Sequence, residues 1–378
     1  MVNEQVETNL AIFNGVYKDK KVLITGHTGF KGSWLTLWLE HLGAKVVGYS
    51  LKPDTHPNNF ESATIQDRII HYFGDTRDTE SLTKVILDHK PDFIFHLASQ
   101  PLVNKSYQEP KETYETNLIG LINVLEAIRT SKLQTVFINI TSDKCYENKE
   151  WTWPYRENDP LGGHDPYSAS KACSEIITIS YRKSFFAEKN YSDHKVAIAT
   201  VRAGNVVGGG DWSKDRIIPD CVRSLSENNP IFIRNPKAIR PWQHVLEPLA
   251  GYLWLGAKLF EDGQKYSQAW NFGSIFPKNL EVLDLVKLVI DLWGSGSYTI
   301  DPDQPKFHEA HYLKLDSHKA INLLKWEPVL DLQKTIEMTV NWYKRYYSGE
   351  KDSFKLCIEQ IKEYEKLAKE KNLYGLKS

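Results

Sequence analysis

The chain has 378 residues, of which 41% are hydrophobic and 12% aromatic, so it can build one large domain or two ordinary domains around a core. Lysine plus arginine (47) nearly balance aspartate plus glutamate (48), and the formal charge is -1. This balance excludes a general attraction to nucleic acid or to an anionic membrane, so an anionic ligand needs a local site. No apolar stretch reaches the roughly 20 residues that a membrane helix needs, and no leader pattern opens the chain, which predicts a cytoplasmic protein.

The four cysteines are far apart and form neither a CxxC motif nor a His/Cys cluster with metal-ligand spacing. We therefore expect reduced thiols and no metal site.

The first half of the chain alternates short apolar runs with longer amphipathic ones, a pattern typical of βαβ units. Residues 21–26, KVLITG, predict a buried strand, and residues 31–43 predict a helix with one apolar face that includes Trp34 and Trp38. Further strands are predicted in KVVGYSL, RIIHYFGD, DFIFHLAS, TVFINITS and VAIATVRAGNV. The fold class is thus α/β, a doubly wound parallel (Rossmann) sheet, and such sheets bind ligands at the carboxyl ends of their strands.

From Gly208 onward the pattern is less regular, and clear helices return only at LEVLDLVKLVIDLW, LQKTIEMTVNWYKRYY and the charged segment that follows. This change predicts a smaller, mixed C-terminal lobe that binds the substrate. The predicted division assigns 15–204 and 244–273 to the Rossmann domain, 205–243 and 274–365 to the second lobe, and 366–378 to a C-terminal tail.

A glycine triplet lies between the first strand and the first helix, in the segment GHTGFKG. Gly26, Gly29 and Gly32 allow a tight turn and close approach of the backbone to a pyrophosphate at the helix amino end, which predicts a dinucleotide site. The acid that usually ends the second strand and binds the ribose of NAD is missing, because Ser50 and Lys52 stand there. The choice between NAD and NADP stays open on this criterion.

Two further patterns suggest a catalytic site. Tyr167 and Lys171 are four residues apart at the start of a predicted helix, so they share one face, and a nearby ammonium favours the phenolate. Ser142 or Thr141 supplies a hydroxyl to the same reacting oxygen. Asp143 and Lys144 come just after the run TVFINI, either as an acid and a base or as an ordinary charged loop.

These features, together with HLASQP (96–101) and TNLIG (116–120), resemble the extended short-chain dehydrogenase/reductase family of nucleotide-sugar enzymes over roughly residues 20–330. The segments GHTGFKGSW, TSDKCY, GGHDPYSASKA and RAGNVVGGGDW are similar, more narrowly, to the CDP-glucose 4,6-dehydratases. The resemblance implies a tightly held NAD, a CDP-sugar substrate and a homodimer or homotetramer.

The resemblance also implies roles for individual residues. The implied cofactor contacts are Gly26, Thr28, Gly29, Phe30, Lys31, Gly32, Ser50, Ala98, Ser99, Gln100, Tyr167 and Lys171. Asp75, which closes the third apolar run, is a candidate for the adenine side or a simple turn aspartate. Family position implies that Asn205, Arg234, Arg240 and His244 line the nucleotide diphosphate, and Arg216 is a further local cation that can contact phosphate oxygens.

The implied reaction oxidises C4 of the sugar, eliminates water across C5 and C6, and reduces C6, so it needs one acid and one base beyond Tyr167 and Lys171. Asp143 is the predicted acid, and Lys144 is the leading candidate for the base. Because the related dTDP-glucose dehydratases have Asp-Glu here, the base stays open. A 4-epimerase, a dehydratase of another nucleotide sugar, and a noncatalytic cofactor sensor remain the alternatives.

Overall fold

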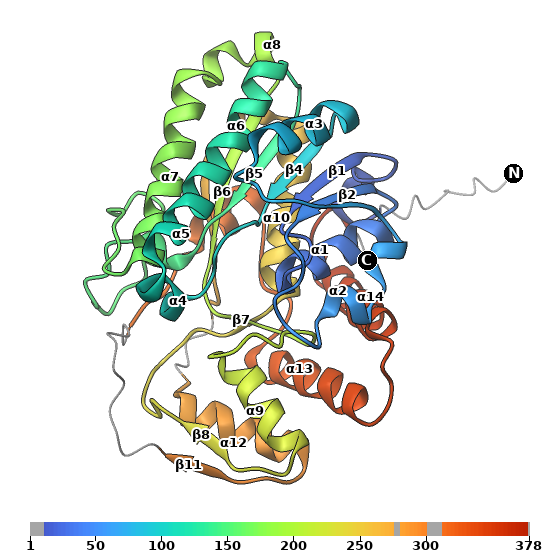
Figure 1. Ribbon diagram of the computed structural model, residues 1–378, viewed down its shortest axis with the longest axis vertical. Coiled ribbons are helices and arrows are strands. Elements are labelled where there is room, and N and C mark those ends of the chain that lie inside the picture. The colour runs from blue at the N-terminus through green and yellow to red at the C-terminus, as the bar shows by residue number, and fades with distance from the viewer. Residues whose placement is uncertain (1–10, 276–279, 301–311, 377–378) are drawn as a thin grey trace, which may run out of the picture.

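The computed structural model describes residues 11–275, 280–300 and 312–376 of the chain (Figure 1). Seven strands form one parallel sheet with the order β10-β6-β5-β4-β1-β2-β3. They are β1 (Lys21–Thr25), β2 (Lys45–Ser50), β3 (Ile70–Phe73), β4 (Phe93–His96), β5 (Val136–Ile140), β6 (Ala197–Ala203) and β10 (Ala269–Phe272). The strand order reverses between β1 and β4, where parallel sheets open a ligand crevice. The predicted doubly wound Rossmann sheet is confirmed.

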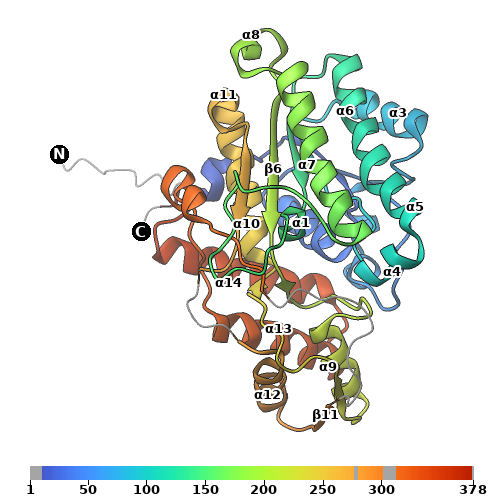
Figure 2. The same cartoon turned by 90° about the vertical axis from the view of Figure 1, so that its left-hand side faces the viewer.

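Helices cover both faces of this sheet (Figure 2). One face carries α3 (Thr79–His89), α6 (Gly120–Ser131) and α7 (Pro166–Ser184) over a core of mostly aliphatic side chains. The other face carries α1 (Phe30–His41) and α10 (Leu246–Glu261), and α14 (Ser353–Glu370) lies outside α1. All the strands of this sheet except the edge strand β3 are mostly buried, as their continuous apolar runs require, whereas most side chains of β3 are exposed.

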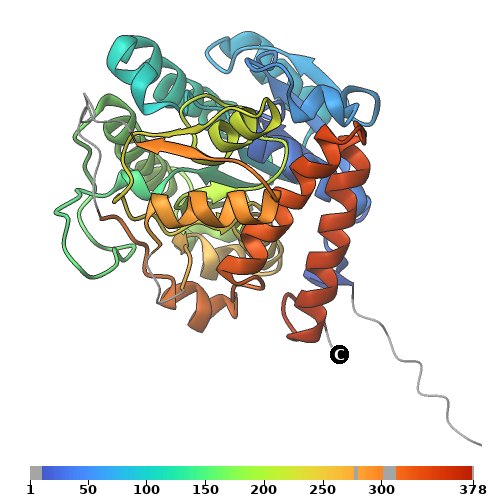
Figure 3. The same ribbon diagram turned by 90° about the horizontal axis from the view of Figure 1, so that it is seen from below.

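A smaller lobe lies below the carboxyl edge of the sheet (Figures 1 and 3). Its elements are β7 (Val206–Val207), α9 (Ile217–Ser226), β8 (Ile231–Ile233), β9 (Gln243–His244), α12 (Val282–Trp293), β11 (Tyr298–Ile300) and α13 (Leu332–Tyr347). Two short parallel pairs, β7 with β9 and β8 with β11, brace it. The remaining helices of the described residues are short: η1 (Ile12–Gly15), α2 (Asn59–Ser62), η2 (Ile65–Asp67), α4 (Val103–Gln108), α5 (Pro110–Tyr114), η3 (Glu115–Ile119), η4 (Asp143–Cys145), η5 (Glu188–Asn190), α8 (Tyr191–His194), α11 (Gly263–Tyr266) and η6 (Ala320–Leu324).

The end of the described chain differs from the predicted tail at 366–378. Helix α14 continues to Glu370, and Tyr374 beyond it is buried against Phe13. The helix covers α1, where Trp38 donates its indole N–H to Glu365 Oε1 at 2.8 Å. Consequently α1 is buried around its circumference, with Trp34 and Trp38 inaccessible, and does not present the single apolar face that its sequence predicts.

Glu247, at the start of α10, ties α14 to the core. Its carboxylate accepts hydrogen bonds from Val329 N, Leu330 N and the Tyr364 hydroxyl at 2.6–3.1 Å. Burial raises the pKa of Glu247 to about 7, although these hydrogen bonds oppose the shift. The folded protein therefore holds this proton more tightly than the unfolded chain does.

This pKa predicts a pH-dependent stability. The contribution of Glu247 to the free energy of unfolding is full below about pH 4.5 and is lost as the pH rises to about 7, at up to about 1 kcal/mol per pH unit. Glu247→Gln should flatten that slope in urea unfolding followed between about pH 5 and 7. The exposed Glu370→Gln is the control and should keep the wild-type slope. An unchanged slope in Glu247→Gln would contradict the assignment.

Candidate active site

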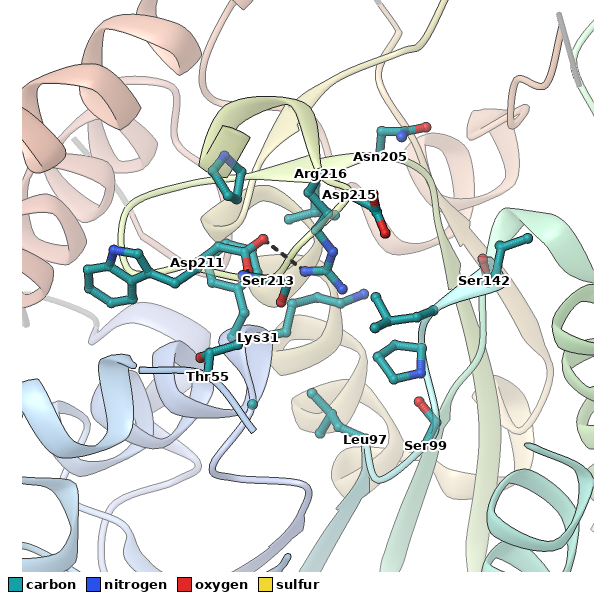
Figure 4. A pocket seen from close by; sticks show the side chains of 18 of the residues that line it. Lys31, Thr55, Leu97, Ser99, Ser142, Asn205, Asp211, Ser213, Asp215 and Arg216 are labelled. Atoms are coloured by element: carbon teal, nitrogen blue, oxygen red, sulfur yellow. Dashed lines mark hydrogen bonds and ion pairs between the residues drawn. The ribbon is translucent and has the colours of Figure 1, made fainter. Parts of the chain in front are cut away.

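A cavity of about 1040 Å³ lies at the carboxyl edge of the sheet and reaches into the smaller lobe (Figure 4). Most of the residues that the sequence predicts for the site line it. They are Gly26, Thr28, Gly29, Phe30, Lys31, Gly32, Ser50, Asp75, Ala98, Ser99, Ser142, Asp143, Lys144, Tyr167, Lys171, Asn205, Arg216, Arg234 and Arg240. Segments that lie up to about two hundred residues apart in the sequence thus meet in one space.

Two predicted site residues lie outside the cavity, and both predictions are corrected here. Gln100 is buried, and its amide bonds Leu102 and the Thr113 hydroxyl, so it braces the loop after β4. His244 is completely buried in β9, where it packs edge-on against Trp34, and burial lowers its pKa to about 3. Neither residue lines the cavity.

The predicted catalytic turn, η4, is separated from the end of β5 by two residues. Ser142 caps it, since its Oγ accepts a hydrogen bond from the Lys144 backbone N–H at 3.2 Å and donates to Asp143 Oδ1 at 2.9 Å. Thr141 also lines the cavity, but its hydroxyl donates to Glu175 Oε1 at 2.5 Å, and Glu175 does not line the cavity. Of the two hydroxyls that the sequence offers for the reacting oxygen, the geometry therefore favours Ser142.

Tyr167 and Lys171 lie in the first turns of α7, which begins after the N-cap Asp165 and Pro166. Burial raises the pKa of Tyr167 to about 12, and a hydrogen bond with Ser142 opposes part of this shift. Burial also lowers the pKa of Lys171 to about 7. In the protein alone, desolvation thus outweighs the activation of the phenol that the spacing of the two residues predicts.

Asp143 and Lys144 differ in exposure. Asp143 is buried, and burial raises the pKa of its carboxyl against the influence of Lys144 and Ser142. Lys144 is half-buried and lines the cavity. A carboxyl with a raised pKa can carry and deliver a proton nearer neutral pH, as a general acid must.

The structure gives Lys31 a neighbour that the sequence did not predict. The sequence assigns Lys31 only to the cofactor phosphates. Lys31 and Arg216 extend into the same part of the cavity, where Arg216 is held by Asp211 at 2.8 Å (Figure 4). Burial, and then the charge of Arg216, lower the pKa of Lys31 to about 8, while Asp143 opposes the shift. The role of Asp211 was not predicted, although its place in the unexplained motif GGGDW was a signal.

The end of the cavity near β2 and β3 contains two of the residues that the sequence predicts to contact the cofactor, Ser50 and Asp75. The Ser50 hydroxyl bonds Thr28 Oγ1 at 2.8 Å, so the two side chains brace the glycine loop. Asp75 lines the cavity. Arg77 donates two hydrogen bonds to its carboxylate, and this bidentate ion pair lowers the pKa of Asp75. Its acceptor capacity is therefore partly used within the protein.

A glycine loop at the switch point of a parallel sheet, with a tyrosine and a lysine on the facing helix, defines an extended short-chain dehydrogenase/reductase. The sequence model of the GDP-mannose 4,6 dehydratase family matches residues 23–339. The chain belongs to this family of nucleotide-sugar 4,6-dehydratases, which confirms the resemblance noted from its motifs.

Individual relatives agree with this assignment. The chain is 48% identical over 334 residues to a CDP-glucose 4,6-dehydratase of Salmonella typhimurium, covering 88% of this chain and 93% of that protein. It is 24% identical over 342 residues to a dTDP-glucose 4,6-dehydratase of Xanthomonas campestris, covering 85% and 92%. Its fold matches the Bacillus anthracis dTDP-glucose 4,6-dehydratase, solved in complex with NAD, with a TM-score of 0.70 at 21% identity, covering 87% of this chain and 98% of that one.

Proposed function

We propose that the protein is an NAD-dependent CDP-glucose 4,6-dehydratase, a hydro-lyase that converts CDP-glucose to CDP-4-keto-6-deoxyglucose. The observation that carries the proposal is one cavity that holds two sets of proton-transfer groups. Tyr167 and Lys171 suit oxidation at C4, and Asp143 and Lys144 suit elimination of water. The nucleotide base is taken from the relative that is 48% identical.

The glycine loop fits a dinucleotide. A Cβ on Gly32 would lie 2.0 Å from the Gly26 backbone oxygen, and one on Gly26 would lie 2.7 Å from Ala98 N, so only glycine permits this packing. Helix α1 has Gly29 at its N-cap and no side-chain cap, which leaves its first N–H groups for a pyrophosphate. Bound NAD would supply the hydride acceptor for the oxidation at C4 and the hydride donor for the reduction at C6. Ala98 and Ser99 would border its nicotinamide.

The protein's own residues move the protons. Tyr167 takes the proton of the 4-hydroxyl, and Ser142 hydrogen-bonds the same oxygen. Charged Lys171 favours the phenolate form of Tyr167. The C4 ketone then acidifies the C5 proton, for which Lys144 is the leading acceptor. Asp143 protonates the departing 6-hydroxyl, so water leaves without an unstable hydroxide.

The substrate diphosphate needs local cations, because the chain as a whole is nearly neutral. Arg216, Arg234 and Arg240 all line the smaller lobe's side of the cavity. Their guanidinium groups can donate pairs of hydrogen bonds to phosphate oxygens. Asn205, a neutral donor, also lines the cavity (Figure 4).

The test is incubation with a panel of nucleotide sugars: CDP-glucose, dTDP-glucose, UDP-glucose and GDP-mannose. We expect CDP-glucose to give the alkaline ultraviolet absorbance of a 4-keto-6-deoxy sugar at the highest rate. Turnover of another substrate with none of CDP-glucose would overturn the substrate assignment. A changed hexose configuration without a keto product would indicate a 4-epimerase.

A further inference from the structure

A buried ion pair lies behind the catalytic turn and outside the cavity. It joins Glu175 on α7, which is fully buried, to Arg202 on β6, which is 1% exposed. Arg202 Nη2 lies 2.8 Å from Glu175 Oε2, and Arg202 Nε donates to Oε1 at 3.0 Å. Removing two charges from water is costly, and the cost is offset only when the pair has good geometry and further hydrogen bonds. The other hydrogen-bond partners of the pair therefore show what it holds in place.

The two residues that flank the catalytic turn both form hydrogen bonds with this ion pair. Before the turn, Thr141 donates its hydroxyl to Glu175 Oε1 at 2.5 Å. After it, the Tyr146 hydroxyl accepts a hydrogen bond from Arg202 Nη1 at 2.6 Å. The segment between them, residues 142–145, contains the acid and the candidate base. One ion pair thus holds the turn at both ends.

The hydrogen bonds around the pair fix its position. Glu175 Oε2 also accepts from Thr200 Oγ1 at 2.6 Å, and the Tyr146 hydroxyl donates to Asn271 Oδ1 at 2.8 Å. Burial raises the pKa of Glu175, but Arg202 and the hydrogen bonds outweigh burial and hold it below its ordinary value. The carboxylate therefore stays charged and oriented at neutral pH.

The same helix carries the oxidation groups. Tyr167, Lys171 and Glu175 follow one another at intervals of four residues in α7, so they share a face. We infer that the ion pair of Glu175 and Arg202 is a clamp that sets the position of the catalytic turn relative to Tyr167. The clamp includes the two hydroxyl residues bonded to the pair, Thr141 and Tyr146. All four residues are positioning residues for the elimination step.

This inference rests on the proposed function and makes a selective prediction. Tyr167 is placed by its own helix, whereas Asp143 and Lys144 are placed by the turn. Loosening the turn should therefore slow elimination and spare the first oxidation. A misplacement of about 1 Å can slow a step about 10²-fold.

The test removes single hydroxyls and leaves the ion pair intact, since removing a buried charge can unfold the protein. Tyr146→Phe and Thr141→Val each delete one arm of the clamp. Tyr155→Phe is the matched control, because Tyr155 stacks on Tyr146 at 5.2 Å and its hydroxyl bonds Asn148 and the Lys149 N–H, not the ion pair.

Three readouts are measured: the rate of nicotinamide reduction in a single turnover of CDP-glucose, the rate of product formation, and amide hydrogen exchange in residues 142–146. In Tyr146→Phe and Thr141→Val we expect product formation to fall about 10- to 100-fold, reduction to stay within about twofold, and exchange to accelerate. Tyr155→Phe should change none of these. Equal slowing of both steps, no slowing, or the same effect in Tyr155→Phe would overturn the clamp. Because exchange needs no substrate, failure of wild-type turnover would refute the proposed function alone.

Discussion

Replacement of Tyr167 by phenylalanine is expected to lower turnover about 10²- to 10⁴-fold and to leave the fold and the cofactor site intact. The ring stays in its buried position, and only the group that accepts the 4-hydroxyl proton is lost. Turnover of CDP-glucose and calorimetric binding of NAD measure the two parts of this prediction.

Tyr252→Phe is the matched control for Tyr167→Phe. Its hydroxyl is also buried, has no hydrogen-bond partner among the described residues, and does not line the cavity. We expect wild-type turnover from this control. Near wild-type turnover by Tyr167→Phe would remove Tyr167 from the mechanism.

The second large effect concerns the acid and the base of the elimination. Asp143→Asn should still oxidise C4 but should lose water about 10²- to 10⁴-fold more slowly, because an amide cannot protonate the 6-hydroxyl. Lys144→Met should block exchange of the C5 proton with solvent. Both variants are followed in deuterium oxide, where mass spectrometry reports deuterium at C5 and the ultraviolet assay reports product.

The competing interpretation is that Lys144 stays charged and steadies the enolate or Asp143, while Tyr167 or another group takes the C5 proton. Exchange at C5 and turnover that both persist at wild-type rates in Lys144→Met would show that Lys144 is not the base. Lys149→Met serves as the control, since Lys149 pairs with Glu147 and lies outside the cavity.

The sequence was informative where neighbours along the chain decide the structure. The strands of the sheet, the glycine loop that begins at Gly26 and the shared face of Tyr167 and Lys171 depend on local spacing, and each occurs as predicted. The predictions for Gln100 and His244 failed because packing decides where a polar side chain points: Gln100 bonds Leu102 and Thr113 in the following loop and helix, and His244 packs on the distant Trp34. An amide can bind a ligand or brace a loop, and only the packed fold distinguishes the two.

Lys31 illustrates the same limit from the other direction. Its place in the glycine loop predicts contact with the cofactor phosphates, but its environment includes Arg216, which belongs to the smaller lobe. No pattern within GHTGFKG indicates that a second lobe supplies that neighbour. The Glu175–Arg202 ion pair was likewise invisible, because its two charges come from a helix and a strand that meet only in the folded sheet.

The position of α14 over α1 has a consequence for synthesis of the protein on the ribosome. Trp34 and Trp38 belong to the first helix of the sheet, yet the helix that covers Trp38 begins only at Ser353. At about 5 to 20 residues per second, the nascent chain exposes this apolar helix for tens of seconds before its cover is translated. The growing chain is therefore expected to need chaperone protection during that interval, and stalled chains that end before α14 should aggregate.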